Sequence, residues 1–229
     1  MESKFYQLDE HRAEKVHELF ATIARRYDLL NDIMSAGMHR RWKRRLVELA
    51  GNPRDVLDLC CGTGDIAMMF QSRVVGADFT AEMLRVAATR AKRVLWVRAD
   101  ALRLPFPDNS FDVVSVGYGL RNLANIEAGL REVLRVLRPN GRILSLDFGK
   151  PESRWLRGVY FGYLRMVLPP LGWMFCGDAD THGYILASLQ RYPAQQGIKE
   201  LMQSCGYCQC GVEEFVGGTM AINFGSKPR

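Results

Sequence analysis

Short runs of apolar residues alternate with stretches of helical periodicity through the middle of the chain. Five runs rich in Val, Leu and Ile end at glycine, proline or polar residues and predict strands, at 56–60, 74–78, 94–99, 111–118 and 142–148. The segments between them place apolar residues at helical spacing and predict helices, at 66–71, 81–92 and 126–137. Strict alternation predicts parallel strands joined by right-handed helical crossovers. The fold class that we expect is therefore α/β, with a mostly parallel, doubly wound sheet.

Helical patterns flank this alternating region on both sides. Residues 10–50 predict two helices, interrupted at Asn31 and again at 35–37. After the fifth strand the chain is helical and aromatic-rich, and strand-like runs at 212–216 and 219–224 close it as an antiparallel hairpin. We expect a single domain, residues 1–229, with four parts: a helical cap (about 1–52), the sheet (53–150), a helical substrate or lid insert (151–193), and a closing helix and hairpin (194–229).

The composition is that of an ordinary globular protein. The 229 residues are 48% hydrophobic and 24% charged, which excludes a disordered chain, a collagen-like repeat and a disulfide scaffold. The net charge of +6 permits an anionic membrane surface or a nucleic acid as a partner without requiring either. No run is long and apolar enough to predict a spanning helix, and the N-terminal residues do not resemble a signal segment.

The six cysteines are too few for a disulfide framework and indicate a reducing, hence cytoplasmic, compartment. Cys205, Cys208 and Cys210 form a C-x-x-C-x-C cluster, which a structural zinc ion could use only with further ligands at matching spacing. No such ligand is evident in the sequence. We therefore expect small buried or edge cysteines and no bound metal.

A glycine-rich turn joins the first strand to the helix that follows it. Gly62-x-Gly64-x-x-Ala67 has the spacing of the nucleotide-binding turn in doubly wound sheets. Dehydrogenases, flavoproteins and methyltransferases share this turn, so the turn alone does not identify the ligand. The ligand is expected at the carboxyl ends of the strands, where Gly117 of the fourth strand also lies.

The charge around this turn distinguishes between the candidate ligands. Asp65 follows the second glycine directly, and Asp58, Asp78 and Asp100 lie at or near strand ends. Four partly desolvated carboxylates would repel the pyrophosphate of a dinucleotide by several kcal/mol. S-adenosylmethionine carries a sulfonium and an ammonium group and no phosphate, so we expect it as the cofactor. A single aspartate at such a position would more simply cap a helix.

The parts of this cofactor can be assigned to parts of the cleft. The backbone of the glycine turn is expected to approach the methionine part. Asp78 is expected to accept hydrogen bonds from both ribose hydroxyls, and Asp100 one from the adenine amino group. The expected cofactor-binding residues are Asp58, Gly62, Thr63, Gly64, Asp78, Asp100, Ala101 and Gly117.

Several segments resemble known methyltransferases. Residues 56–65 (VLDLCCGTGD) and 104–111 (LPFPDNSF) resemble class I S-adenosylmethionine-dependent methyltransferases. More specific segments are similar to the ubiquinone/menaquinone C-methyltransferase family (UbiE/MenG): FATIARRYDLLNDIMSAGMHRRWKRR at 20–45, GYGLRN at 117–122, GDADTHGYILASLQRYP at 177–193 and VGGTMAINFG at 216–225. The resemblance covers nearly the whole chain. It implies a Rossmann-like class I methyltransferase fold with a seven-stranded sheet.

The resemblance also implies a reaction and its partners. The expected reaction is C-methylation of demethylmenaquinol to menaquinol, with S-adenosylhomocysteine as the second product and no metal. The alternative acceptor is 2-methoxy-6-polyprenyl-1,4-benzoquinol of ubiquinone biosynthesis, or both quinols. Because a polyprenylated naphthoquinol is dissolved in the bilayer, we expect a cytoplasmic enzyme in transient, peripheral contact with the inner face of the membrane. The oligomeric state is open, with a homodimer as one option.

Other classes of function fit the sequence less well. An NAD-dependent oxidoreductase is disfavoured by Asp65 and by the lack of a phosphate-compatible turn. Methyltransferases that act on DNA bases usually carry a [DNS]-P-P-[YFW] motif after the fourth strand, where this chain has Gly117-Tyr118-Gly119-Leu120. No recognition domain is apparent either, so we expect no nucleic-acid partner. A methyltransferase with another small-molecule acceptor is the more distant alternative.

Five residues are candidates for the proton chemistry of quinol methylation. The ring carbon becomes nucleophilic when the neighbouring phenol loses its proton. Arg121 and Asn122 follow the fourth strand on the substrate side of the cofactor. The Arg121 guanidinium is expected to stabilise that phenolate, and a surface ion pair is its alternative. Tyr27 or Asp28 could contact the quinol oxygen, although Asp28 could instead form only a helix-end hydrogen bond. His39 could carry a proton near neutral pH, and a purely basic surface face is the equal alternative.

The insert carries an amphipathic helix between Arg154 and Leu168. Its apolar residues share one face of a helical wheel, at Leu156, Val159, Tyr160, Tyr163 and Val167. The basic residues fall roughly opposite, at Arg154, Arg157 and Arg165. Such a helix lies on a membrane surface or lines a hydrophobic tunnel, and an ordinary lid over the sheet is the alternative. With a prenyl-tailed substrate, this helix is our candidate for binding the tail.

Overall fold

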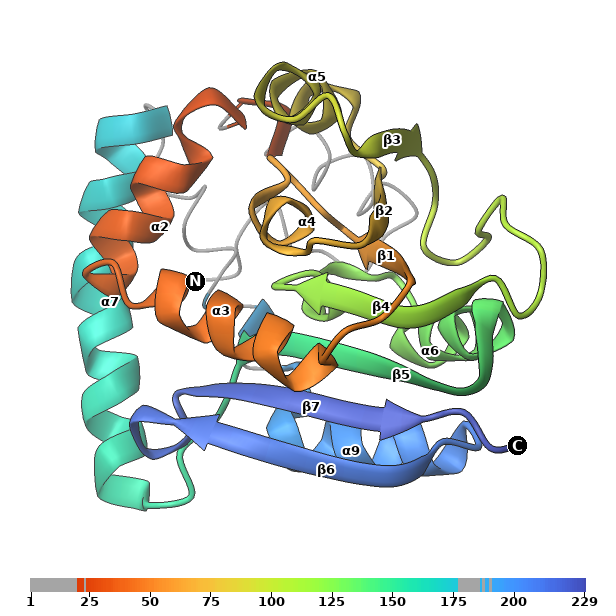
Figure 1. Ribbon diagram of the computed structural model, residues 1–229. Coiled ribbons are helices and arrows are strands. Elements are labelled where there is room, and N and C mark those ends of the chain that lie inside the picture. Colours follow the sequence, from red (N-terminus) through yellow and green to blue (C-terminus); the bar gives the residue numbers. More distant parts are fainter. Residues whose placement is uncertain (1–19, 23, 177–185, 187, 190) are drawn as a thin grey trace.

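A seven-stranded sheet organises the computed structural model, which describes residues 20–22, 24–176, 186, 188–189 and 191–229 (Figure 1). The strands lie in the order β3-β2-β1-β4-β5-β7-β6. Their bounds are β1 Asp55–Leu59, β2 Arg73–Asp78, β3 Leu95–Arg98, β4 Phe111–Gly117, β5 Leu137–Phe148, β6 Cys208–Phe215 and β7 Met220–Ser226. The first five strands are parallel, and β7 runs antiparallel to both β5 and β6. The predicted doubly wound sheet with a closing hairpin is confirmed.

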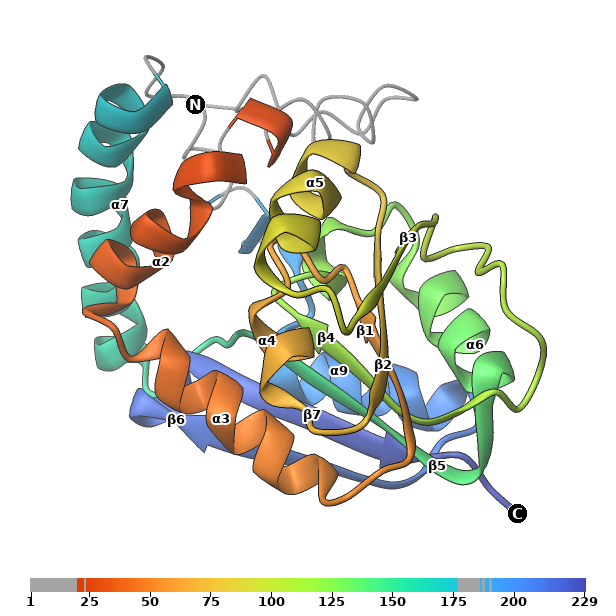
Figure 2. The same cartoon turned by 45° about the horizontal axis from the view of Figure 1, so that its top comes forward.

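Helices cover both faces of this sheet (Figure 2). Their bounds are η1 Ala24–Arg26, α2 Tyr27–Ser35, α3 His39–Ala50, α4 Asp65–Met69, α5 Ala81–Arg90, η2 Leu120–Asn122, α6 Ile126–Val136, α7 Arg154–Cys176, α9 Ala194–Ser204 and η3 Val216–Gly218. Successive strand residues point to opposite faces. Leu57 of β1 accordingly packs in the cluster that contains α6 and α9, whereas Val56 packs in the cluster that contains α3 and α4. The core is therefore divided by the sheet into two layers.

Helices α2 and α7 lie side by side at one end of the molecule in both ribbon views (Figures 1 and 2). Met34 of α2 packs against the cluster that contains Leu164 and Leu168 of α7. This pair of helices stands beside Tyr118 and Phe148, where β4 and β5 end. The insert thus contributes a side wall next to the strand ends, which is where ligands of such sheets bind.

The predicted interruption of the N-terminal helices at Asn31 is wrong. Helix α2 continues through Asn31 to Ser35, and the break follows at Ala36, whose φ of 47° is left-handed. Tyr27 therefore begins a helix instead of ending one. The first part of the expected helix, around Val16, lies outside the described residues.

The fifth strand begins earlier than the predicted 142–148, because β5 starts at Leu137 and includes the turn-like residues Pro139, Asn140 and Gly141. The pairing between β4 and β5 shifts register after Phe111 and Leu137 and resumes at Val113 and Arg142. Asn140 takes a left-handed φ of 63° within the shifted segment. The turn residues thus form an irregularity of a longer strand. Across the described part of the chain, no helix has the length and apolarity needed to cross a bilayer.

Candidate active site

A cavity of about 190 Å³ opens at the carboxyl ends of β1, β2 and β4. The predicted site residues on its lining are Tyr27, Gly62, Asp78, Asp100, Ala101, Gly117 and Asn122. Much of the remaining wall is apolar, with Leu59, Met83 and Leu102 among its members. Among its described lining residues there is no Lys, Arg or His. This first cavity therefore offers two carboxylates set in apolar walls, which suits a ligand that carries positive charge and an aromatic base.

Asp78 ties the end of β2 to the glycine turn. Its Oδ2 accepts a hydrogen bond from the Gly62 amide at 2.8 Å, and its Oδ1 accepts one from the Thr80 amide at 2.8 Å. A carboxylate offers about four acceptor positions. Because Asp78 also lines the cavity, its carboxylate can accept hydrogen bonds from hydroxyl groups of a ligand there. This geometry is consistent with the expected ribose contact.

The glycine turn has the backbone conformation that its residues predict. Gly64 has a φ of 86°, in the left-handed region that glycine adopts without steric cost. A Cβ at Gly64 would lie 2.4 Å from the ring of Trp96, so the position also lacks space for a side chain. Gly64 lies against Trp96, and Gly62 lines the cavity itself. The two glycines thus have different roles, because Gly64 packs against Trp96 and Gly62 lines the cavity.

Asp58 lies behind the turn, buried to 1% exposure. Its Oδ1 accepts a hydrogen bond from the Ser115 hydroxyl at 2.7 Å, and its Oδ2 accepts one from the Ala67 amide at 2.9 Å. Burial raises the pKa of Asp58 to about 7. Asp58 anchors the start of α4 through the Ala67 amide and does not line the first cavity. It lines a small recess at the glycine turn with Gly62 and Thr63, so its contact with a ligand stays a prediction.

Asp65 is neutralised by two cations. Its carboxylate pairs with Lys43 at 2.9 Å and with Arg90 at 2.8 Å. Lys43 is 4% exposed, so it does not contribute to a basic surface face around His39. Asp65 was expected to be an unpaired negative charge that repels a pyrophosphate, and this expectation is wrong. The acidic character of the first cavity comes from Asp78 and Asp100.

Asp28 and Thr63 hold α2 against the glycine turn. Asp28 Oδ1 accepts a hydrogen bond from the Thr63 hydroxyl at 2.8 Å, and its Oδ2 pairs with Arg90 at 2.6 Å. Neither Asp28 nor Thr63 is among the residues that line the first cavity. Of the two interpretations of Asp28, the geometry favours a structural hydrogen bond. Tyr27 does line the cavity, and burial raises its pKa to about 12, so it remains a hydrogen-bond donor at neutral pH.

A second cavity, of about 290 Å³, lies between α2, α3 and α7. Tyr118 lines both cavities and marks the place where they meet. The walls of the second cavity are mainly apolar and aromatic, with contributions from Met34, Met38, Trp42, Phe148, Tyr160, Tyr163, Leu164, Val167 and Leu168. The insert helix therefore lines an apolar cavity beside the first, as one of its two interpretations expected. Val159 differs from the predicted face, because it is 52% exposed.

Three polar side-chain atoms in the residues around the second cavity are buried without a hydrogen-bond partner within the described ranges. They are Asn31 Nδ2, His39 Nδ1 and Tyr160 Oη. Of these three residues, only His39 is among the sequence candidates for the site. Asn31 lies one helical turn after Tyr27 and so shares its face, a signal that could have identified it. Tyr160 was expected on the apolar face of the insert helix, but no spacing in the sequence relates its hydroxyl group to α2 or α3.

Arg121 is buried to 6% exposure and turned toward the protein interior. Its Nε lies 3.2 Å from Asp147 Oδ1, its Nη1 donates to the Ser188 hydroxyl at 3.1 Å, and its guanidinium lies 5.0 Å from the Phe148 ring centroid. Arg121 lines neither of the two cavities, whereas Asn122 lines the first. A surface ion pair is excluded for Arg121. Direct contact with an acceptor phenolate stays a prediction without geometric support.

Metal ligands do not gather in the part of the chain that the structure describes, where no three His, Cys, Asp or Glu side chains form a group suited to a metal ion. The three clustered cysteines have different surroundings. Cys205 is buried at the end of α9, Cys208 is exposed at the start of β6, and Cys210 is half-buried.

The chain is similar to known methyltransferases over nearly its whole length. The family model of the ubiE/COQ5 methyltransferase family matches residues 8–227. A protein of Azotobacter vinelandii named ubiquinone/menaquinone biosynthesis C-methyltransferase UbiE is 41% identical, over 95% of this chain and 91% of its own length. A protein of the same name from Ectopseudomonas mendocina is 42% identical, over 95% of this chain and 90% of its own length.

Solved structures share the fold at low sequence identity. A Thermotoga maritima S-adenosylmethionine-dependent methyltransferase, described as a possible histamine N-methyltransferase, superposes with a TM-score of 0.67 at 18% identity, covering 91% of this chain and 99% of its own. Phosphoethanolamine N-methyltransferase 2 of Haemonchus contortus, in complex with S-adenosylmethionine, has a TM-score of 0.60 at 17% identity, covering 82% of this chain and 53% of its own. These likenesses support the class I methyltransferase fold.

Proposed function

Because the chain belongs to the ubiE/COQ5 methyltransferase family, we propose that this S-adenosylmethionine-dependent C-methyltransferase converts demethylmenaquinol to menaquinol. The observation that carries the proposal is the pair of cavities that meet at Tyr118. One is acidic and lies at the glycine turn, and the other is apolar and lined by aromatic residues. A methyl donor and a prenylated ring need two such compartments in contact.

The first cavity fits S-adenosylmethionine by the chemistry of its donor set. Asp78 can accept from ribose hydroxyls, and Asp100, with Ala101 beside it, can flank the adenine. The absence of basic side chains from its described lining disfavours a pyrophosphate ligand. When bound, the cofactor supplies an electrophilic methyl group to the ring carbon. The protein has to orient that carbon, exclude water and move protons.

The second cavity fits a fused aromatic ring and the start of an apolar tail. Trp42, Tyr118, Phe148, Tyr160 and Tyr163 give it several ring faces, against which a bicyclic naphthoquinol has more area than a benzoquinol. This aromatic lining favours the naphthoquinol. The benzoquinol of ubiquinone biosynthesis is the second candidate, because the named relatives serve both pathways.

An assay with labelled S-adenosylmethionine tests this choice of acceptor. Demethylmenaquinol and 2-methoxy-6-prenyl-1,4-benzoquinol with equal short tails would be supplied separately in the same detergent. We expect label in the methylated naphthoquinol at a kcat/KM at least about tenfold above that of the benzoquinol, a difference of ~1.4 kcal/mol. An equal or reversed preference would contradict the assignment of the naphthoquinol as acceptor. Label in neither quinol would contradict quinol methylation as the function.

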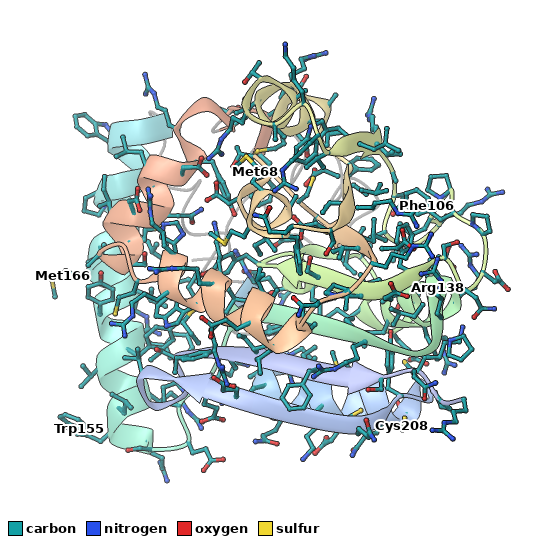
Figure 3. The ribbon with its side chains drawn as sticks, in the orientation of Figure 1. Met68, Phe106, Arg138, Trp155, Met166 and Cys208 are labelled. Atoms are coloured by element: carbon teal, nitrogen blue, oxygen red, sulfur yellow. The ribbon has the colours of Figure 1, made fainter. Side chains whose placement is uncertain are left out.

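The outer face of α7 supports contact with a membrane that holds the substrate. Trp155, Met166 and Trp173 are 76%, 75% and 71% exposed, and spacings of eleven and seven residues put them on one side of the helix. Figure 3 shows Trp155 and Met166 pointing away from the body of the protein. Arg154 and Arg165, both exposed, lie on the same helix and surround a shallow depression. Exposed aromatic and basic side chains on one helix are typical of helices that bind anionic membrane surfaces.

Vesicle binding tests the proposed membrane contact. Burying a large apolar side chain contributes roughly 1.5–3 kcal/mol, so the triple variant Trp155→Ser, Met166→Ser, Trp173→Ser should partition into phosphatidylglycerol vesicles at least ~10-fold less than the wild type. Leu95→Ser is the matched control, since Leu95 is 62% exposed on the edge strand β3. Unchanged partitioning of the triple variant would refute the contact. A wild-type dimer that the triple variant converts to a monomer would assign this face to a second copy of the chain instead.

A further inference from the structure

His39, buried on the wall of the second cavity, is hydrogen-bonded to the half-buried Asp32 behind it. His39 opens α3 and is 2% exposed, and its Nε2 lies 2.8 Å from Asp32 Oδ1 on α2. Arg40 holds both oxygens of the same carboxylate, at 2.9 Å and 2.6 Å. These contacts lower the pKa of Asp32, so its carboxylate is ionised and acts only as an acceptor. The proton of a neutral His39 ring is therefore on Nε2, and the lone pair is on Nδ1.

In the protein alone, the Nδ1 lone pair accepts no hydrogen bond from the residues that the structure describes. His39 Nδ1 is buried without a partner in the described part of the chain, and the same holds for Asn31 Nδ2 and Tyr160 Oη. All three residues line the second cavity. An unsatisfied buried polar atom costs about 1–3 kcal/mol. One acceptor and two donors, on residues that line a mainly apolar cavity, match a ligand with a hydroxyl group.

Resting on the proposed function, we propose that the Asp32–His39 pair is the general base of the reaction, with Nδ1 removing the proton of the acceptor's ring hydroxyl in the second cavity. The O–H bond breaks, an N–H bond forms at Nδ1, and the electron pair stays on the oxygen as a phenolate. Asn31 Nδ2 and Tyr160 Oη then donate to that oxygen. Asp32 stabilises the imidazolium, as a carboxylate does beside a catalytic histidine. Each methyl transfer to a ring carbon releases one proton overall, which must pass to solvent.

The groups around His39 keep it neutral and able to accept a proton. Burial lowers the pKa of His39, and the nearby Lys43 lowers it further, whereas Asp32 and Asp65 raise it. Lys43 is itself paired with Asp65, so the two largely offset each other. The ring is therefore mainly unprotonated at neutral pH, as a base must be.

The tyrosines that face His39 across the cavity cannot take this role. Tyr118, Tyr160 and Tyr163 are the other titratable groups on its lining. Burial raises the pKa of Tyr118 and of Tyr160, so both stay protonated and act as donors. Tyr163 is 47% exposed, so it is not a buried group of this lining. His39 is the titratable group on this lining that combines burial with a lone pair.

A coloured phenol tests the assignment without methyl transfer. A nitronaphthol without a prenyl tail would be titrated by absorbance on the full-length protein, wild type and His39→Gln. Gln can still donate an N–H to Asp32 but offers no imidazole lone pair. The apparent pKa of the bound phenol should be about one unit lower on the wild type than on the variant, since a nearby imidazolium favours the phenolate. Equal values would overturn the proposal.

Kinetics with the quinol give a second, independent outcome. His39→Gln should lower kcat about 10²–10⁴-fold and abolish the fall of kcat at acidic pH. The affinity for S-adenosylmethionine should not change. Arg41→Gln, exposed on the same helix, is the control and should retain wild-type values. If His39→Gln does not fold, Asp32→Asn serves instead, because it removes the carboxylate that fixes the tautomer. Normal kcat in either folded variant would refute the base.

The two experiments separate this proposal from the choice of reaction. The phenol titration contains no methyl donor and no lipid quinol. A shift that depends on His39, together with no methylation of any quinol, would refute the proposed function and leave the base intact. If the protein methylates a quinol but His39→Gln changes neither the pKa of the bound phenol nor the pH profile, the proposed function stands and the base is refuted.

Discussion

Replacing Asp78 by alanine is expected to weaken S-adenosylmethionine binding about 100-fold or more. Asp78 lines the first cavity, and two hydrogen bonds from ribose hydroxyls to a charged carboxylate contribute about 1.5–3 kcal/mol each. Tenfold in affinity corresponds to ~1.4 kcal/mol. The substitution also removes the acceptor of the Gly62 and Thr80 amides, which loosens the turn that approaches the cofactor. Isothermal calorimetry with S-adenosylmethionine measures the change directly.

Two further variants separate the ligand contact from the turn. Asp78→Asn keeps one oxygen and the shape of the side chain, so its affinity should lie between those of wild type and alanine variant. Asp108→Ala removes an exposed carboxylate that pairs with Arg135 outside the cavity, and should bind like the wild type. An unchanged dissociation constant for Asp78→Ala would take Asp78 out of the cofactor site.

Replacing Arg121 by alanine is expected to lower the free energy of unfolding by about 3–5 kcal/mol. The Arg121–Asp147 pair is buried on both sides, at 6% and 4% side-chain exposure, and removal of one partner leaves a buried charge uncompensated. Burial already raises the pKa of Asp147, and loss of Arg121 removes the main group that lowers it. Urea denaturation followed by circular dichroism gives the free energy.

The double variant Arg121→Met, Asp147→Leu is the matched control. Replacing both charges by apolar groups of similar size is often nearly neutral, so the double variant should be more stable than Arg121→Ala. If Arg121→Ala is as stable as the wild type, the pair is not structural and direct action on the substrate regains support. Loss of turnover in Arg121→Ala alone would be ambiguous, because destabilisation produces the same loss.

The sheet was predictable because its signals are local. The central parallel strands are short apolar runs, such as Val56–Leu59, that are buried on both faces, and the glycine turn is defined by two nearby residues. The hairpin was also predictable from the sequence, since Gly217 and Gly218 separate its strands. Element ends were less accurate, because continuation through Asn31 depends on packing of α2 against α7.

The charge pairing and the exposure of several side chains could not be predicted, because they depend on tertiary contacts between residues that are distant in the sequence. Asp65 looked like a free anion until Lys43 and Arg90, from two other helices, were brought against it. Arg121 follows the strand as expected, yet Asp147 of the neighbouring strand turns it inward. The helical wheel of the insert identified Tyr160 as part of an apolar face without showing that the opposite apolar side chains, such as Trp155, stay exposed.

The second cavity illustrates the same limit. Its polar atoms come from α2, α3 and α7, and no sequence spacing relates Asn31 and His39 to Tyr160. His39 was suggested by its chemistry alone, with a basic surface as an equal alternative. Its burial and its pairing with Asp32 across the turn between α2 and α3 decide between them in favour of an internal role.

A crystal structure of the protein with S-adenosylhomocysteine and a short-tailed demethylmenaquinone tests the central claim most directly, because that claim is the division of labour between two adjoining cavities. We predict the ribose hydroxyls on Asp78, the naphthoquinone ring in the second cavity against Tyr118, and one ring oxygen within hydrogen-bond distance of His39 Nδ1. A quinone bound elsewhere, or a nucleoside whose ribose does not contact Asp78, would contradict the account.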